Sequence, residues 1–356
     1  QLLQQGVTAQ KEGKLEEAEQ LYRNILESDP RHPNANHNLG IILILLNKSS
    51  EEAEASLKKA IKFKPDYVDA YNNLGLVQKI SGKFKEAELS ITKAIELEPE
   101  NANAYNNLGT IQEDFKQFEK AEESFKKAIK FKPDYADAHY NLGNTLNNLQ
   151  RIDEAETTYK KVIEIKPDYA NAHNNLAIVQ KKLGKYEEAE VSYKKTIKLK
   201  PDFAEAYSNL GVVLKDIGNF DEAIACYKKA IELKPNYETA HYNLGLALYE
   251  SGKFKEAAEE FKLNDFRNSK ELLLVCLFKM NEQKLFYEQL DYLIKRGDNN
   301  ALIGSLISLA EIKFKINREN LFCKKPLKYI LKTDLIKNCD FKTIFVKTIK
   351  DVLDND

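Results

Sequence analysis

Small and apolar residues recur along this chain at the spacing of one face of a helix, in pairs of segments that alternate with polar turns. Residues 68–101 are typical, with Ala70 and Leu74 on one segment and Ala87, Ile91 and Ala94 on the next. Spacings of three and four residues place such side chains on one stripe of an α-helix. The pattern therefore predicts two amphipathic helices that pack against each other, separated by a turn.

The helix pair is repeated at a fixed interval. An Asn-Leu pair returns seven times, the first interval being 35 residues and every later one 34. A proline returns with the same period, and we number each repeat so that this proline is position 32. The prolines are Pro30, Pro65, Pro99, Pro133, Pro167, Pro201 and Pro235. A period of this size predicts a helical solenoid, in which each repeat packs only on its neighbours.

The repeat resembles the tetratricopeptide repeat, which has two antiparallel helices. Its signature is Ala at positions 3 and 20, Leu at 7, Gly or Ala at 8 and an aromatic or aliphatic residue at 24. A glycine stands between the two helices in four repeats, as Gly82, Gly184, Gly218 and Gly252. The Ala-Tyr-Asn-Asn-Leu-Gly openings are similar to those of the repeats that precede the catalytic domain of O-linked N-acetylglucosamine transferases. The resemblance covers residues 1 to about 261, with repeats starting near residues 1, 33, 68, 102, 136, 170, 204 and 238.

We therefore expect an all-α fold, a right-handed superhelical solenoid of about eight helix-turn-helix units. The signature fails in the eighth repeat, where position 27 is Asn264 and position 32 is Ser269. Residues 262–316 keep helical periodicity and are predicted to form a degenerate helical cap on the array. Because the chain opens within a repeat and lacks an initiator Met, we expect a fragment or a processed product.

Residues 317–356 are predicted to be a linker-like helical tail. Their segment from Asn320 to Tyr329 resembles the one that joins such repeats to a 2-oxoglutarate and iron dependent oxygenase domain in some bacterial proteins. The iron triad of that family is missing, since no His follows His241. The resemblance implies a catalytic domain beyond Asp356.

One polar residue is kept at a single position of the first helix. Position 6 is Asn in seven consecutive repeats, namely Asn38, Asn73, Asn107, Asn141, Asn175, Asn209 and Asn243. Asn is a poor helix former, and its amide can hold a peptide backbone by N–H and C=O together. In the related transferases such asparagines line the concave surface and hold peptide, so the resemblance implies peptide binding here. The alternative is structural: these amides hydrogen-bond the neighbouring repeat and hold the superhelix.

The residues around this row predict the chemistry of a ligand. Positions 2 and 13 carry acids in several repeats, and position 9 is mostly apolar. The acids are Asp69, Asp137, Glu205, Asp114, Asp216 and Glu250, and the apolar residues include Ile41, Leu76, Ile178, Val212 and Leu246. A weakly acidic groove with an apolar strip suits an extended protein or peptide segment that is neutral to basic. Lys79, Lys181 and Lys215 at position 12 are expected on the rim.

The charge of the chain and its cysteine and histidine residues bear on which partners and which chemistry to expect. The chain has 31% charged residues and a formal net charge of -1, which gives no reason to expect nucleic acid or a membrane as partner. Cys226, Cys276, Cys323 and Cys339 are far apart and are expected to be free thiols of a cytoplasmic protein. His139, His173 and His241 share position 4 with tyrosines, so we expect packing rather than metal binding. We expect no catalytic residue, no metal and no cofactor.

The sequence thus predicts a non-catalytic scaffold that binds protein or peptide in an Asn-lined concave groove. Two alternatives stay open. The chain could be the substrate-recognising arm of a larger enzyme, a glycosyltransferase or a 2-oxoglutarate oxygenase. It could also be a self-assembling scaffold, a homo-oligomer that pairs through its first or last repeat.

Overall fold

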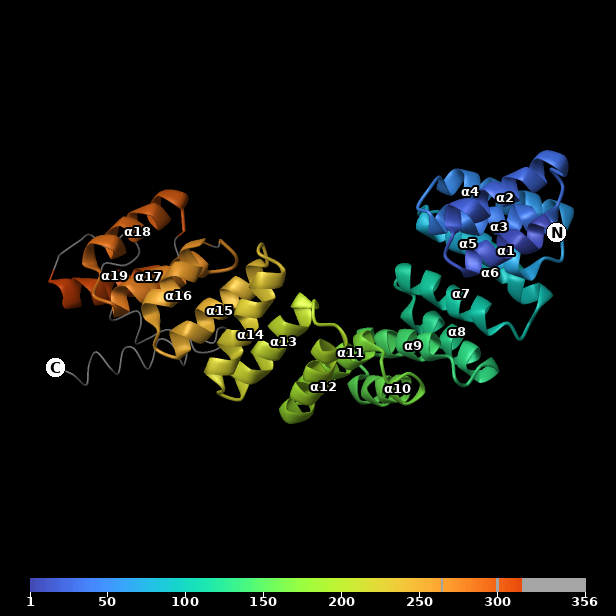
Figure 1. Cartoon of the computed structure of the whole chain (residues 1–356). Helices are drawn as coiled ribbons and strands as arrows, with labels where there is room; N and C mark the ends of the chain where they lie inside the picture. Colours follow the sequence, from blue (N-terminus) through green and yellow to red (C-terminus); the bar gives the residue numbers. More distant parts are fainter. Residues whose placement is uncertain (264, 299–300, 316–356) are drawn as a thin grey trace. The chain divides into compact units, whose positions relative to one another are not determined.

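The computed structural model describes residues 1–263, 265–298 and 301–315, and this part of the chain is helical without any strand (Figure 1). It falls into two compact units, Gln1–Pro201 and Asp202–Asp356. The helices of the first unit are α1 Leu2–Lys11, α2 Leu15–Ser28, α3 Pro33–Leu45, α4 Ser50–Phe63, α5 Val68–Ile80, α6 Phe84–Leu97, α7 Ala102–Asp114, α8 Phe118–Phe131, α9 Ala136–Asn148, α10 Ile152–Ile165, α11 Ala170–Lys182 and α12 Tyr186–Leu199. The second unit contains α13 Ala204–Asp216, α14 Phe220–Leu233, α15 Glu238–Glu250, α16 Phe254–Leu263, α17 Ser269–Lys279, α18 Gln283–Arg296 and α19 Ala301–Phe314.

Up to α16, each repeat is one antiparallel pair of an odd-numbered and an even-numbered helix. Within each compact unit, one pair packs on the next, and this arrangement confirms the predicted all-α solenoid. The helices α17, α18 and α19 follow the last repeat, and the role of this region as a cap stays a prediction. Residues 316–356, and with them the predicted tail, Cys323 and Cys339, lie outside the described residues, as does Asn264.

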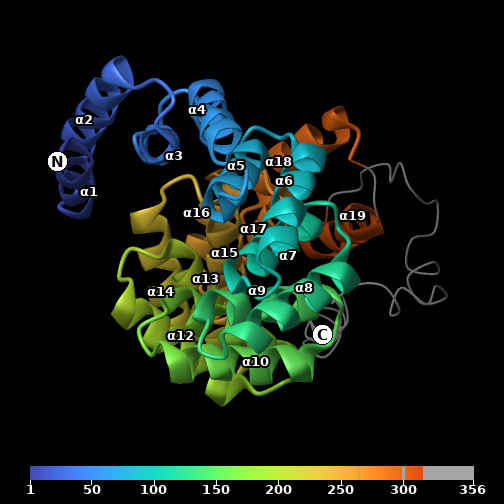
Figure 2. The same cartoon turned by 90° about the vertical axis from the view of Figure 1, so that its right-hand side faces the viewer.

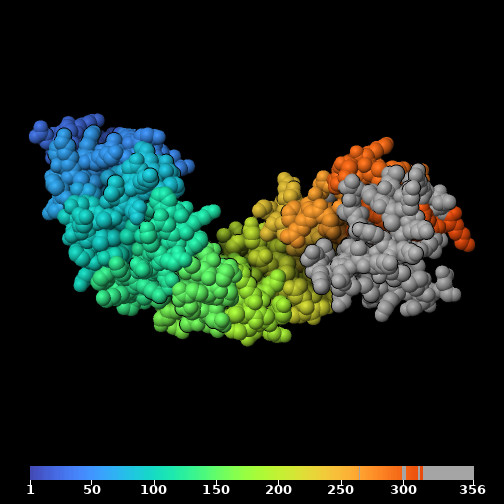
Figure 3. All heavy atoms as spheres, turned by 180° about the vertical axis from the view of Figure 1, so that it is seen from behind, coloured from blue at the N-terminus to red at the C-terminus, as the bar shows by residue number. Residues whose placement is uncertain are grey.

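Consecutive first helices of the first unit come into contact with each other. This holds for α3 with α5, α5 with α7, α7 with α9 and α9 with α11, whereas no two second helices in the described residues approach as closely. Figure 2 shows α5, α7 and α9 side by side. We call the surface formed by positions 2, 6, 9 and 13 of α3, α5, α7, α9 and α11 the inner face. In the space-filling view, the atoms of residues 1–201 form a continuous surface (Figure 3).

A glycine and an aromatic ring bring the two helices of a repeat together. A Cβ atom added to Gly109 on α7 would lie 2.6 Å from Cε1 of Phe125 on α8. Gly143 stands in the same relation to Tyr159, again with 2.6 Å to Cε1. Both rings are buried, so the hydrogen atom at position 8 makes room for the large side chain at position 24. This packing explains why the repeat signature has Gly or Ala at position 8 and a large residue at position 24.

The turn between the helices of a repeat requires a left-handed residue at position 15. Gly82 and Gly184 have φ values of +73° and +74°, as their placement in the sequence leads one to expect. Lys116 and Gln150 occupy the same position with φ values of 58° and 61°. A residue with a Cβ is strained in this region by about 1–2 kcal/mol. The turn therefore forms with or without glycine at position 15, and a search for glycine does not find every such turn in the sequence.

This strain gives a testable expectation. Replacing Lys116 and Gln150 together with Gly should stabilise the chain by about 1 kcal/mol, because the strain relieved exceeds the added entropy of the unfolded chain. Urea denaturation measures the change. Lys120→Gly, at an exposed position within α8, is the control and should instead cost about 1 kcal/mol. Equal destabilisation by both changes would contradict the assignment of strain to the turn.

None of the helices in residues 1–263, 265–298 and 301–315 combines the length and apolar character needed to cross a membrane.

Candidate functional site

The Asn at position 6 forms a hydrogen bond with the preceding repeat. In the fourth repeat Asn107 Nδ2 donates to Asn72 Oδ1 over 2.9 Å, and in the fifth Asn141 Nδ2 donates to Asn106 Oδ1 over 3.0 Å. The acceptor is the position 5 residue of the repeat before, so each bond joins two consecutive first helices. The hydrogen bonds of the structural alternative are therefore present at these two repeats.

Other repeats use a different acceptor. Asn73 Nδ2 lies 2.9 Å from His37 Nε2, and His37 again occupies position 5. Asn175 Nδ2 donates both to Tyr140 Oη over 3.1 Å and to Asn144 Oδ1 over 2.9 Å. In the second compact unit, Asn209 and Asn243 form no side-chain hydrogen bond with a described residue of that unit.

The amides differ in what they leave available to a ligand. Asn73, Asn107 and Asn141 are partly exposed, and their Oδ1 atoms accept no hydrogen bond from a described residue. Asn175 is fully engaged, because its Oδ1 also accepts from Asn174 Nδ2 over 3.1 Å. Asn38 Oδ1 lies 3.1 Å from His37 Nδ1. Three amides of the row thus present a fixed acceptor oxygen and a second N–H on the inner face.

His37 is held neutral by its surroundings. Burial lowers the pKa of its imidazole, which is only 7% exposed. Since the amide nitrogen of Asn73 can only donate, His37 Nε2 accepts and Nδ1 carries the proton toward Asn38 Oδ1. Protonation of Nε2 would remove the acceptor that Asn73 uses.

The pH dependence of the stability of the fold should therefore reflect the protonation of His37. Because its pKa is lower in the folded chain, the unfolded chain binds the proton first, and stability falls as pH drops below the ordinary value of 6.5. His37→Asn, which copies position 5 of the next repeat, should flatten urea-measured stability between about pH 7 and pH 5 by roughly 1 kcal/mol. An unchanged slope in His37→Asn would contradict the assignment.

The carboxyl group of Glu113 connects the first helices α7 and α9. Glu113, near the end of α7, accepts a hydrogen bond at Oε1 from Thr145 Oγ1 of α9 over 2.6 Å. Burial raises the pKa of Glu113. Its neighbour Asp114 is paired with Lys79 of the preceding repeat, with 3.2 Å between Nζ and Oδ2. Lys79 therefore reaches across to the next repeat and neutralises one of the acids.

A second inter-repeat network was missed from the sequence. Glu54 Oε2 on α4 lies 2.7 Å from Lys83 Nζ at the start of the next second helix, and Oε1 lies 2.7 Å from Lys58 Nζ. Glu122 with Arg151 and Glu156 with Lys185 repeat this contact at 2.7 and 2.6 Å. In the sequence, these ion pairs could have been recognised from an acidic residue at position 21 followed by a basic residue 29 positions later. These ion pairs hold repeats together and leave the inner face to other side chains.

The histidines at position 4 serve the packing of loops. His139, His173 and His241 each place Nε2 3.0 Å from the carbonyl oxygen of the preceding position 32 proline. His241 also lies 2.7 Å from Glu260 through Nδ1. No group of three or more His, Cys, Asp or Glu side chains in the described residues could hold a metal ion.

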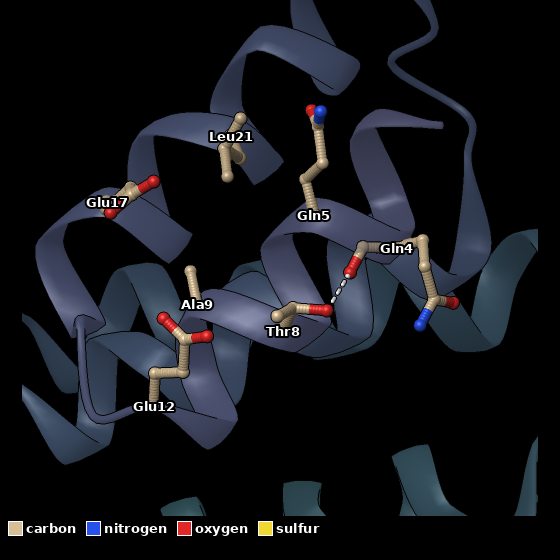
Figure 4. A pocket seen from close by; sticks show the side chains of 7 residues that line it. All are labelled: Gln4, Gln5, Thr8, Ala9, Glu12, Glu17 and Leu21. Carbon is tan, nitrogen blue, oxygen red and sulfur yellow. Dashed lines mark hydrogen bonds between the residues drawn. The ribbon is translucent and has the colours of Figure 1, made fainter.

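A hollow of about 380 Å³ lies on α1 and α2 and is lined by Gln4, Gln5, Thr8, Ala9, Glu12, Glu17 and Leu21 (Figure 4). Thr8 Oγ1 there donates to the Gln4 carbonyl oxygen over 3.0 Å. In the third repeat the residues equivalent to Gln5, Thr8 and Ala9 are Leu74, Val77 and Gln78, which are buried. The hollow therefore lies on the surface by which repeats stack and lacks the features of a ligand site.

Family models agree with this architecture over much of the chain. Models described as TPR repeat match residues 49–82, 116–150 and 213–252. Models described as tetratricopeptide repeat match residues 134–202, then 91–123 and 192–225, and finally 2–32 and 68–101. Among curated proteins no sequence matches the chain.

Solved structures share the fold. The Cut9 and Hcn1 hetero-tetramer of the APC/C is 18% identical, covers 68% of this chain and 48% of that chain, and has a TM-score of 0.59. PilF of Pseudomonas aeruginosa is 20% identical over 62% of this chain and 96% of that chain, with a TM-score of 0.54. YrrB, a TPR protein with an unusual peptide-binding site, is 23% identical over 52% of this chain and 95% of that chain, with a TM-score of 0.45. With its helix pairs and matched repeats, the chain belongs to the tetratricopeptide repeat family.

Proposed function

We propose that this chain is a non-catalytic scaffold that binds an extended segment of another protein along its inner face. The observation that supports the proposal most is the state of Asn73, Asn107 and Asn141. Each is fixed by a bond to the preceding repeat and still offers a carbonyl oxygen and an N–H. A peptide backbone needs this combination, because its N–H and C=O groups must both find partners when water is displaced.

The spacing of the row suits an extended chain. Consecutive first helices pack roughly 8–10 Å apart, and an extended peptide advances about 3.3–3.6 Å per residue. One amide therefore meets about every third residue of the ligand. Each contact contributes only about 0.5–1.5 kcal/mol, so affinity depends on several of them acting together. The same amides serve both structure and binding, since the inter-repeat bond sets the direction in which the free oxygen points.

The experiment compares two sets of amides. Replacing Asn73, Asn107 and Asn141 with Ala should weaken capture of unstructured peptides by about 10-fold or more, measured by fluorescence anisotropy on a peptide panel. Asn175→Ala is the matched control, because its amide has no group left for a ligand. It should lower the melting temperature with little change in capture. If the triple variant melts earlier and binds as before, the row is structural only.

Whether peptide capture depends on the fixed orientation of the position 6 amides can be tested separately. Asn72 and Asn106 accept the inter-repeat bonds but do not belong to the row. Asn72→Ala with Asn106→Ala should weaken peptide capture about 3-fold, because Asn107 and Asn141 then lose the bond that fixes their amides. Capture at wild-type affinity by this pair, with weakened capture by the triple variant, would show that the amides need no fixing.

A further inference from the structure

An apolar patch lies on the inner face at α3 and α5. Leu45 and Ile80 are the last residues of these helices, share position 13, and are 55% and 64% exposed. Ile41 and Leu76 lie four residues earlier on the same helix faces and are partly exposed. The helices α3 and α5 are in contact, and we call these four side chains together the α3–α5 patch.

The patch belongs to the same stripe as the amide row. Position 13 is about 20° from position 6 around the helix axis, two turns further along. A ligand that meets Asn73 is therefore within reach of Ile80. Exposed aliphatic side chains of this size cost free energy in water, and their burial by a partner recovers about 25 cal/mol per Å².

Polar groups replace the patch in the following repeats. Position 13 becomes Asp114 and then Asn148, and position 9 becomes Thr110 and then Asn144. Lys79 pairs with Asp114, whereas Glu113 forms no ion pair with a described residue. Its Oε1 is bound by Thr145, and Oε2 accepts no hydrogen bond from a described residue. Glu113 is at position 12, beside position 9 at the border of the inner face, so a cationic side chain would find its counter-charge there, one repeat beyond Ile80.

We propose that the inner face of the first compact unit selects segments with two aliphatic side chains and one Lys or Arg, each three residues apart. This inference rests on the proposed function and adds its ligand class. A polyproline II segment fits the spacing, because it has three residues per turn and rises about 3.1 Å per residue. Every third side chain then faces the protein about 9 Å from the last, close to the distance between consecutive first helices. Its backbone has no internal hydrogen bonds and stays open to the amide row.

The test uses labelled synthetic peptides and the full chain. The probes contain Leu-Ser-Ser-Leu-Ser-Ser-Lys, the reversed order, a version with both Leu replaced by Ser, and a version with Lys replaced by Gln. Anisotropy should show that the chain binds either the first peptide or the peptide of reversed order. Replacing both Leu residues with Ser should weaken peptide binding roughly 10-fold or more. Replacing Lys with Gln should weaken it about 3- to 10-fold, and less at high salt.

Protein variants locate the effect. Leu45→Ser with Ile80→Ser should abolish the preference for Leu in the peptide. Leu89→Ser with Val191→Ser is the matched control, since these residues are 72% and 69% exposed on the second helices α6 and α12. Glu113→Gln keeps an oxygen for Thr145 and should abolish the preference for Lys over Gln. Thermal melts of all variants verify that they are folded.

Several outcomes would overturn the inference. One is that neither order binds at about 1 mM peptide. Another is that the control pair weakens binding as much as the patch pair, or that the Leu preference persists without Leu45 and Ile80. Loss of Asn73, Asn107 and Asn141 should weaken all binding peptides alike. If it does so while the patch variants change nothing, the ligand class is wrong and the proposed function stands.

Discussion

Replacing Phe125 with Ala is expected to destabilise the first compact unit by about 3–5 kcal/mol. The ring is fully buried on α8 and fills the space that Gly109 leaves open on α7. It belongs to one apolar cluster with Leu142 and Leu146 of the next repeat. Its loss therefore opens a cavity at the junction of two repeats as well as within one.

Urea denaturation followed by circular dichroism measures this loss. Because repeats contact only their neighbours, we expect the variant to unfold in two steps, with the fourth and fifth repeats melting first. Leu89→Ala removes an apolar side chain that is 72% exposed and should change stability by less than about 0.5 kcal/mol. A loss below about 1 kcal/mol for Phe125→Ala would show that the helices collapse around the site.

Replacing Glu54 with Gln is expected to cost about 2 kcal/mol at pH 7. Only 8% of the Glu54 side-chain surface is exposed. Its carboxylate forms ion pairs with the ammonium groups of Lys58 and Lys83. The hydrogen bonds from Lys58 and Lys83 lower its pKa from 4.5 to about 2. A depressed acid pKa stabilises the folded chain above pH 4.5, and this contribution is lost as pH falls toward 2.

The difference in stability between wild type and Glu54→Gln should therefore shrink from pH 7 to about pH 2.5. The chain offers a control in Glu88, which shares position 21 but has Gln117 where Glu54 has Lys83 and Thr92 where it has Lys58. Glu88→Gln should change stability little at pH 7. If Glu54→Gln and Glu88→Gln have equal effects, the two ion pairs of Glu54 contribute nothing.

The sequence predicts most of the fold because the fold is local. Leu74, Gly75, Ala87 and Ile91 each have a role that a helix wheel defines, and the structure places them accordingly. The left-handed turn at Lys116 could not be predicted, since its residue type does not favour that backbone conformation. The neighbouring helices impose the strain there.

The contacts between repeats were less predictable. Asn107 could be assigned to an open stripe, but its partner Asn72 is 35 residues away and carries no distinguishing signal. Leu45 and Ile80 lie at a position that is charged or carries an amide in later repeats, so the average pattern conceals them. Repeat averages describe what all units share, whereas the α3–α5 patch depends on how particular units differ.

The bond from Asn107 to Asn72 also has a consequence for how the length of such an array can change. The third, fourth and fifth repeats each carry a donor at position 6 and an acceptor at position 5. A duplicated or deleted stretch of 34 residues therefore brings or removes a matched donor and acceptor together. The row of amides can therefore lengthen or shorten by whole repeats without any new interface. His37 and Tyr140 show that the acceptor can be exchanged while the donor stays Asn.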